Sequence, residues 1–147
     1  MKQLSRALLI CWCLAGCGGP LGMIHGGKLD GMAVSDSVED WSFTRDVEEI
    51  QLETNPADPY SVNVWCVGKG PSLWVTAGRE ANTWAQNLVA DPRVRVRIGD
   101  KIYERKAVRV TDPQEVELVL SLYEEKYDYE RKPNGVGHPT QFRLDPP

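Results

Sequence analysis

The sequence predicts an α+β fold in which about six mostly antiparallel strands and two helices build a small barrel. The first observation is that the hydrophobic period changes twice between Ser72 and Val110, from a strand to a short amphipathic helix and then to a long hairpin. The second is that the predicted strands follow one another through short connections, whereas a parallel crossover needs about a dozen residues or more. This order of elements indicates a barrel with a helix lying across it.

Three strands are expected in the first half of the folded domain, which we place at residues 41–147. β-branched and aromatic residues favour an extended backbone, and proline- or glycine-containing turns separate the three segments. The predicted strands are Val47–Thr54, Tyr60–Val67 and Leu73–Thr76.

Two helices and a hairpin follow. Asn82 suits the N-cap of a short helix that Asp91-Pro92 ends, and Asp112 suits the N-cap of a longer helix that extends to about Tyr127. The inward side of the short helix is predicted to carry Trp84, Ala85, Leu88 and Val89. The hairpin pairs Val94–Ile98 with Ile102–Val110 through a turn at Gly99-Asp100, and a last strand, Thr140–Leu144, is expected to close the sheet beside the first strand.

Residues 1–16 have the features of a secretory signal peptide. Lys2 and Arg6 precede a short apolar stretch, and the tetrapeptide Leu14-Ala15-Gly16-Cys17 resembles the lipobox of bacterial lipoproteins. This resemblance implies cleavage before Cys17 and lipidation of that residue, with several acyl chains holding the protein at a membrane. We therefore expect a lipid-anchored protein of the bacterial cell envelope that faces outside the cytoplasm.

Two alternatives to the lipoprotein remain open. Translation that starts at Met23 or Met32 would give a cytoplasmic protein, or the apolar stretch is coincidental. Residues 17–40 are rich in glycine and show little periodicity, so we expect a flexible tether there.

Composition limits the function classes. The formal net charge of −4 at pH 7 argues against a nucleic-acid partner, because phosphate backbones are bound by clustered Lys and Arg. Two histidines, His25 and His138, do not suffice for a metal site or a catalytic triad, and we expect no metal. Cys66, the cysteine left unmodified in a mature lipoprotein, lies in an apolar strand and is expected to be a small buried hydrophobe.

The stretch LWVTAGREANTWAQNLVADPRVRVRIGDKIYE resembles the flavin/deazaflavin-binding split β-barrel superfamily, which includes pyridoxamine-phosphate-oxidase-like proteins and deazaflavin-dependent nitroreductases. The superfamily pattern is a helix of the form W-x-x-N-L, a D/N-P stop and an alternating strand. The matching residues here are Trp84, Asn87, Leu88, Asp91, Pro92 and Val94. The resemblance extends over roughly residues 47–144, although its specific part is only about thirty residues long.

The resemblance implies a split β-barrel that forms a homodimer and binds FMN or a deazaflavin in a groove between barrels. The cofactor phosphate would meet Thr76, Gly78 and Arg79 at the end of the third strand, and Trp84 and Asn87 would line the same groove. The implied activity is that of an oxidoreductase that transfers hydride between the bound cofactor and a small substrate.

One segment departs from the deazaflavin pattern. Those enzymes carry a basic, glycine-containing loop before the second strand, whereas residues 54–59 here contain neither Arg nor Lys. Export also separates a protein from the cytoplasm, where flavin nucleotides and deazaflavins are made. The alternative hypothesis is a non-enzymatic exported module that binds a ligand or partner and has lost the cofactor site.

Two further residue sets each have two interpretations. Arg93, Arg95 and Arg97 alternate with apolar residues and share one strand face, which is either an anion-binding face or, as we favour, a solvent face balanced by nearby acids. Trp65, Trp74 and Trp84 are expected as core or dimer-interface residues before any of them is assigned to a cofactor ring.

Overall fold

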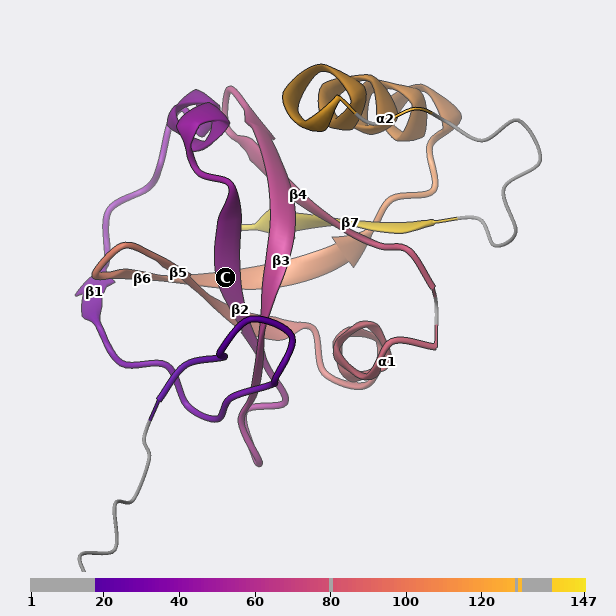
Figure 1. Cartoon of the computed structure of the whole chain (residues 1–147). Coiled ribbons are helices and arrows are strands. Elements are labelled where there is room, and N and C mark those ends of the chain that lie inside the picture. Colours follow the sequence, from indigo (N-terminus) through magenta and orange to yellow (C-terminus); the bar gives the residue numbers. More distant parts are fainter. Residues whose placement is uncertain (1–17, 80, 129, 131–138) are drawn as a thin grey trace, which may run out of the picture.

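In the computed structural model, which describes residues 18–79, 81–128, 130 and 139–147, six antiparallel strands close into a barrel and a short seventh strand is added at its edge (Figure 1). This is the predicted α+β split barrel. The strands are β1 (Met32–Val34), β2 (Glu49–Thr54), β3 (Tyr60–Lys69), β4 (Ser72–Ala77), β5 (Arg93–Ile98), β6 (Lys101–Arg109) and β7 (Thr140–Asp145). The helices are the 3-10 helix η1 (Ser42–Asp46), α1 (Thr83–Ala90) and α2 (Pro113–Tyr127).

The barrel closes through β7, which pairs with both β4 and β6. Thr76 lies opposite Gln141 on one side of β7, and Ala107 lies opposite Leu144 on the other. The prediction that the last strand lies beside the first is therefore wrong. The β5–β6 hairpin folds back so that β5 takes the free edge of β2, and this leaves the edge of β6 for β7.

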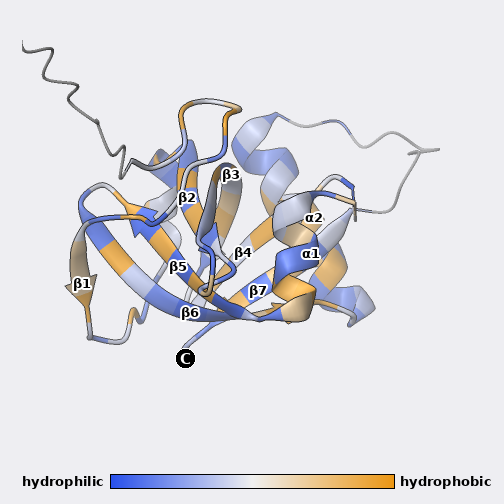
Figure 2. Cartoon of the chain, turned by 90° about the horizontal axis from the view of Figure 1, so that it is seen from below, coloured by the Kyte–Doolittle hydropathy of each residue, from blue (hydrophilic) through white to orange (hydrophobic). Residues whose placement is uncertain are grey.

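The barrel interior is filled by alternate residues of the strands. Figure 2 shows hydrophilic and hydrophobic residues alternating along β5 and β6. The fully buried residues of this interior include Ile50, Leu52, Val75 and Val96. Cys66 is also fully buried, which confirms its predicted role.

The helix α2 covers part of the outer surface of the barrel, above β3 and β4 in Figure 1. Beneath it lies a second apolar cluster, which contains Val67, Trp74, Val110, Val119 and Tyr123. Trp74 and Trp84 are buried, as expected for core residues, whereas Trp65 is 45% exposed and stacks on Tyr127 with ring centroids 4.4 Å apart.

The short helix α1 differs from its prediction at one residue. It buries Trp84, Ala85 and Leu88, but Val89 is exposed. Each residue of an α-helix advances by roughly 100°, so Val89 follows Leu88 away from the barrel rather than into it.

The arginine face of β5 points away from the core, as the favoured interpretation predicts, but only Arg93 of its three arginines is exposed to solvent, because the N-terminal segment covers Arg95. Arg93 pairs with Asp91 at 2.6 Å, and Arg95 pairs with Glu53 at 2.8 Å. The Nη1 atom of Arg97 donates to Oε1 of Gln51 at 3.3 Å.

Residues 26–34, which the sequence places in a flexible tether, lie against the barrel. Gly26 and Ser61 exchange two backbone hydrogen bonds of 2.8 and 2.9 Å, Leu29 is fully buried, and β1 pairs in parallel with β6. The folded unit thus extends to the N-terminal side of residue 41. The predicted signal peptide, the predicted lipidation site at Cys17 and His138 lie outside the described residues.

Candidate functional site

A cleft of about 680 Å³ lies between the N-terminal segment, the turn from β2 to β3, and α1. We call it the α1 cleft. The N-terminal side is formed by Gly18, Gly19, Leu21, Ile24, His25, Gly26 and Gly27. The opposite side is formed by Asn55, Asp58, Pro59, Tyr60, Thr83 and Asn87. Three segments that are separate in the sequence therefore meet around one space.

Asn87 joins α1 to the strands beside the cleft. Its Nδ2 atom donates to Oγ1 of Thr54 at 3.0 Å, and the Thr54 hydroxyl donates to the Tyr60 carbonyl at 3.1 Å. Thr83 lies four residues before Asn87 and therefore on the same helix face, so both side chains reach the cleft. The hydrogen bonds fix the position of the Asn87 amide relative to the end of β2 and the start of β3.

The N-terminal wall of the cleft is held by backbone packing and by one ring contact. The His25 ring stacks on Tyr60 with centroids 4.5 Å apart. A Cβ atom on Gly26 would lie 2.6 Å from the backbone carbon of Gly19, so two parts of this wall approach more closely than any side chain would permit.

The residues predicted to bind the cofactor do not all lie at the α1 cleft. Asn87 lines the α1 cleft, whereas Trp84 lies in the barrel core with its ring centroid 6.2 Å from that of Phe142. Gly78 and Arg79 are exposed in the turn that leads to α1, and the Arg79 carbonyl accepts the N–H of Asn82 at 3.1 Å. The structure therefore brings Gly78 and Arg79 to the start of the cleft helix but gives Trp84 a packing role.

Thr76 lies on the outer face of β4 that α2 covers. It shares this face with Trp74, and it lies beside the hydroxyl of Tyr123. Its Oγ1 atom is buried and has no hydrogen-bond partner among the described residues. Burial raises the pKa of the Tyr123 hydroxyl far above its usual value, and this hydroxyl donates to the Trp65 carbonyl at 2.9 Å.

Sequence reasoning missed His25, Tyr60 and Thr83 as cleft residues. The sequence predicts a strand at Tyr60 and a flexible tether at His25. His25 and Tyr60 lie far apart in the chain but their rings are in contact. The spacing of hydrophobic residues within a strand or helix gives no information about such a contact. Thr83 was within reach of sequence reasoning, because it lies one helical turn before Asn87.

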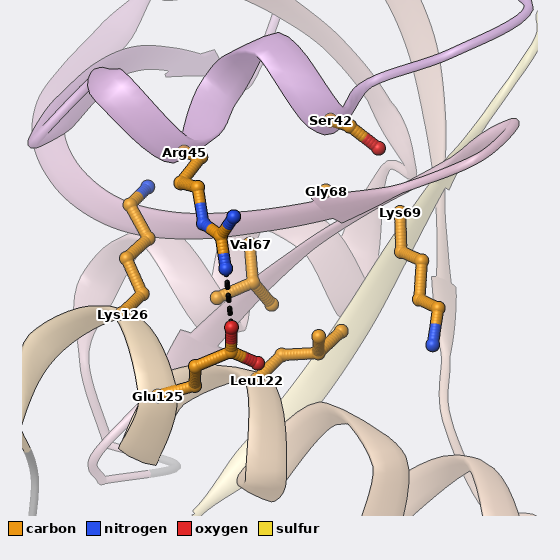
Figure 3. A pocket seen from close by; sticks show the side chains of 8 residues that line it. All are labelled: Ser42, Arg45, Val67, Gly68, Lys69, Leu122, Glu125 and Lys126. Carbon is orange, nitrogen blue, oxygen red and sulfur yellow. Dashed lines mark hydrogen bonds and ion pairs between the residues drawn. The ribbon is translucent and has the colours of Figure 1, made fainter.

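A second cleft, of about 290 Å³, lies between η1, β3 and α2 (Figure 3). Figure 3 shows Arg45 and Glu125 pointing toward each other across it, and the two side chains form an ion pair. The Nζ atom of Lys126 donates to the carbonyls of Thr44 and Cys66 at 2.8 and 2.6 Å. Through these contacts the charged groups attach α2 to η1 and β3. We therefore interpret this cleft as a packing boundary between α2 and the barrel and call it the seam.

The side chain of Cys66, whose carbonyl accepts the Lys126 hydrogen bond, lies in the barrel core. Burial raises the pKa of its thiol to about 11, against the opposing effect of the Lys126 charge. The thiolate is the reactive form of cysteine, and at neutral pH this side chain remains a thiol.

Within the described ranges, no group of three or more His, Cys, Asp or Glu side chains is arranged to hold a metal ion. No helix in that part of the chain is both long and apolar enough to cross a membrane.

Solved structures with the same fold include proteins of several described activities. An F420-H2 dependent reductase, FDR-A, aligns with a TM-score of 0.55 and 16% identity over 80% of this chain and 100% of its own. A domain-swapped dimer aligns with a TM-score of 0.58 and 22% identity over 68% and 81% of the two chains. A protein from Listeria innocua, described as a candidate pyridoxamine 5'-phosphate oxidase, aligns with a TM-score of 0.54 and 13% identity over 67% and 83%. At these identities the likeness establishes the fold alone.

Comparison of the sequence with curated proteins found no match. Comparison with protein families did: the profile of the F420H(2)-dependent quinone reductases matches residues 57–143. This range contains all of β3, both α-helices and, except for Asn55, the Asn87 side of the α1 cleft. Because the match covers more than half of the chain, this protein belongs to the F420H(2)-dependent quinone reductase family.

Proposed function

We propose that this protein is a deazaflavin-dependent oxidoreductase that binds its cofactor in the α1 cleft and transfers hydride to a small substrate. The observation that carries the proposal is the position of the cleft on the helix with the W-x-x-N-L pattern, where Asn87 is fixed by Thr54. Family membership supports the choice of a deazaflavin over FMN as the cofactor.

The cleft residues fit the ring part of such a cofactor. Small-molecule sites commonly enclose about 300–1,000 Å³, and the α1 cleft encloses about 680 Å³. The stacked rings of His25 and Tyr60 supply an aromatic surface, and the glycines of the N-terminal wall let a flat ring approach the backbone. A bound reduced deazaflavin would supply the hydride, while Asn87 and the glycine wall orient the ring and exclude water.

The phosphate part of the cofactor needs a positive partner. Among the described residues that line the cleft there is no Lys or Arg. Arg79 and Gly78 in the turn before α1 would hold the phosphate, together with backbone N–H groups at the start of the helix. The side chain of Asn82 does not cap this helix, so it does not compete for those N–H groups.

Direct titration tests the proposal. Purified protein is titrated with oxidised F420 and, separately, with FMN, and binding is followed by cofactor fluorescence. We expect F420 to bind, Asn87→Ala to weaken binding about tenfold or more, and Gln86→Ala, an exposed change on the same helix, to have no effect. Saturable binding of neither cofactor would overturn the proposal.

One observation favours a second candidate, the non-enzymatic module that has lost its cofactor site. Asp58 is the charged residue of the turn from β2 to β3, at the position where deazaflavin enzymes carry basic residues. Arg79→Ala separates the two candidates. A cofactor-binding enzyme should lose affinity for F420, whereas a module without the site should show no F420 binding before or after the change.

We further propose that the protein is a lipoprotein of the bacterial cell envelope, processed after residue 16 and anchored through Cys17. The lipobox resemblance supports this location. Metabolic labelling with a fatty acid should mark the wild-type protein but not Cys17→Ser. An unlabelled cytosolic protein that starts at Met23 or Met32 would contradict the anchor.

We also propose that the protein acts as a homodimer. The domain-swapped dimer among the similar structures supports this assembly. Light scattering of the purified protein measures the assembly directly, and a monomer at micromolar concentration would contradict it.

A further inference from the structure

A short turn near the N-terminus of the described chain exposes three large apolar side chains. Leu21, Met23 and Ile24 are 78%, 104% and 70% exposed. We call residues 21–24 the apolar tip. Exposed apolar groups of this size cost free energy in water, and a cluster of them indicates a surface that meets another apolar phase.

The apolar tip has a defined shape and a fixed place on the barrel. Leu21 and Ile24 exchange two backbone hydrogen bonds of 3.1 and 2.9 Å, and Gly22 takes a φ of 56° between them. The Nδ2 atom of Asn63 on β3 donates to the Gly22 carbonyl at 3.1 Å. The tip is therefore presented by the fold and is not a loose stretch of chain.

The sequence places the apolar tip close to the proposed lipid anchor. Leu21 follows Cys17 by four residues, and an extended chain spans at most about 3.6 Å per residue, so the two Cα atoms are within roughly 14 Å of each other. The hydrocarbon core of a bilayer is about 30 Å thick, and the polar region on each side adds several ångströms. An anchor at Cys17 would therefore bring the tip to the membrane surface.

We propose that the apolar tip inserts into the lipid surface around the anchor and thereby turns the mouth of the α1 cleft toward the bilayer. This inference rests on the lipid anchor of the proposed function. Leu21 and Ile24 belong both to the tip and to the wall of the cleft, so the cleft rim and the lipid-facing surface are continuous.

A spin label at position 23 tests the contact. Met23 is fully exposed and does not appear among the residues that line the α1 cleft, so Met23→Cys should leave both fold and cleft intact. Cys66 is buried with a pKa of about 11 and should not react at neutral pH. The full chain is purified from membranes, labelled, and reconstituted into phosphatidylglycerol-containing vesicles. Leu118→Cys on the exposed side of α2, at the far end of the barrel from the tip, is the control (Figure 1).

The expected result is a label at position 23 that collides more often with oxygen than with an aqueous nickel complex, while the label at position 118 shows the reverse. The reverse pattern at both positions, in protein that floats with the vesicles, would overturn the tip contact and leave the anchor standing. Spin–spin broadening at position 23 would also overturn it, because a second copy of the chain would then cover the tip.

The number of spin labels per chain tests the lipid anchor at Cys17 separately from the lipid contact of the apolar tip. One label on Met23→Cys shows that Cys17 is blocked, as an anchored protein requires. More than one label shows a free thiol at Cys17, alone or together with Cys11 and Cys13 of an uncleaved signal peptide, which contradicts the anchor and with it the membrane contact.

Discussion

Glu53 and Arg95 form an ion pair between the neighbouring strands β2 and β5, and together they bind the backbone of Leu29. The Nη1 atom of Arg95 lies 2.8 Å from Oε2 of Glu53 and donates to the Leu29 carbonyl at 3.0 Å. Oε2 of Glu53 accepts the Leu29 N–H at 2.5 Å. The Glu53 side chain is only 6% exposed and that of Arg95 27% exposed, so this pair fastens the N-terminal segment to the barrel away from bulk water.

Glu53→Gln should therefore destabilise the protein and release residues near Leu29. Loss of one partner leaves Arg95 partly buried without a counter-ion, and we expect a loss of about 2–4 kcal/mol in the free energy of unfolding. Urea denaturation measures the loss, and hydrogen exchange of the Leu29 amide measures the release.

Glu104→Gln is the matched control, because Glu104 lies opposite Arg95 on the other neighbouring strand but is exposed. An exposed charge contributes little, so this variant should change stability by less than about 1 kcal/mol. Equal effects of the two substitutions would contradict the role given to Glu53.

Thr76→Val should stabilise the protein and leave cofactor binding unchanged. The buried Oγ1 atom of Thr76 has no hydrogen-bond partner in the described part of the chain, and valine has nearly the same shape without the polar atom. Removal of an unsatisfied buried hydroxyl should raise the free energy of unfolding by about 1 kcal/mol. Thermal denaturation and F420 titration check the two outcomes, and a fall in F420 affinity would restore Thr76 to the phosphate site that the family resemblance implies.

Local sequence signals sufficed for most elements of the fold. The β5–β6 hairpin was predictable because glycine suits the positive φ of 62° that the turn imposes on Gly99. The start of α2 was predictable because Asp112 caps the helix by accepting the Glu115 N–H at 3.2 Å. Such signals act between residues a few positions apart, which is the distance at which a sequence pattern is readable.

Long-range partners were not predictable in the same way. β7 pairs with β4 and β6 because β5 of the hairpin already pairs with the edge of β2. The sequence of residues 140–145 does not show which strand edges remain unpaired. The glycine-rich N-terminal segment was expected to be flexible, yet Leu29 is held by a pair whose members lie 24 and 66 residues away. The α1 cleft depends on the same segment, so one side of the candidate site followed from the helix pattern and the other side did not.

The stability of the protein should fall as the pH rises above about 9. The pKa of the Cys66 thiol is raised by burial from 9.0 to about 11, so between these values the folded protein holds a proton that the unfolded chain has lost. The stabilising effect of the neutral thiol is complete below pH 9 and disappears as the pH passes the folded pKa, with a total of roughly 3 kcal/mol.

Comparison with Cys66→Ala isolates this contribution. The variant loses packing at every pH, but its free energy of unfolding should decrease less steeply between pH 9 and pH 11, because no thiol titrates. Urea denaturation at four or five pH values in this range gives both slopes. Parallel curves would show that Cys66 does not carry the dependence.

Gly26→Ala and Gly27→Ala should differ sharply, although the two residues are adjacent in the wall of the α1 cleft. A Cβ atom on Gly26 would lie 2.6 Å from the backbone of Gly19, whereas on Gly27 its contact is the Pro59 carbonyl at an ordinary 3.8 Å. Backbone atoms cannot move aside as a side chain can, so Gly26→Ala should force residues 18–20 and residue 26 of the N-terminal wall apart. The shift of residue 26 should strain its paired hydrogen bonds with Ser61. We expect a loss of about 1–3 kcal/mol in stability, faster hydrogen exchange at Ser61 and at least tenfold weaker F420 binding. Gly27→Ala should keep all three properties close to those of the wild type. If F420 binds equally well to both variants while only Gly26→Ala loses exchange protection at Ser61, the N-terminal wall is not part of the cofactor site.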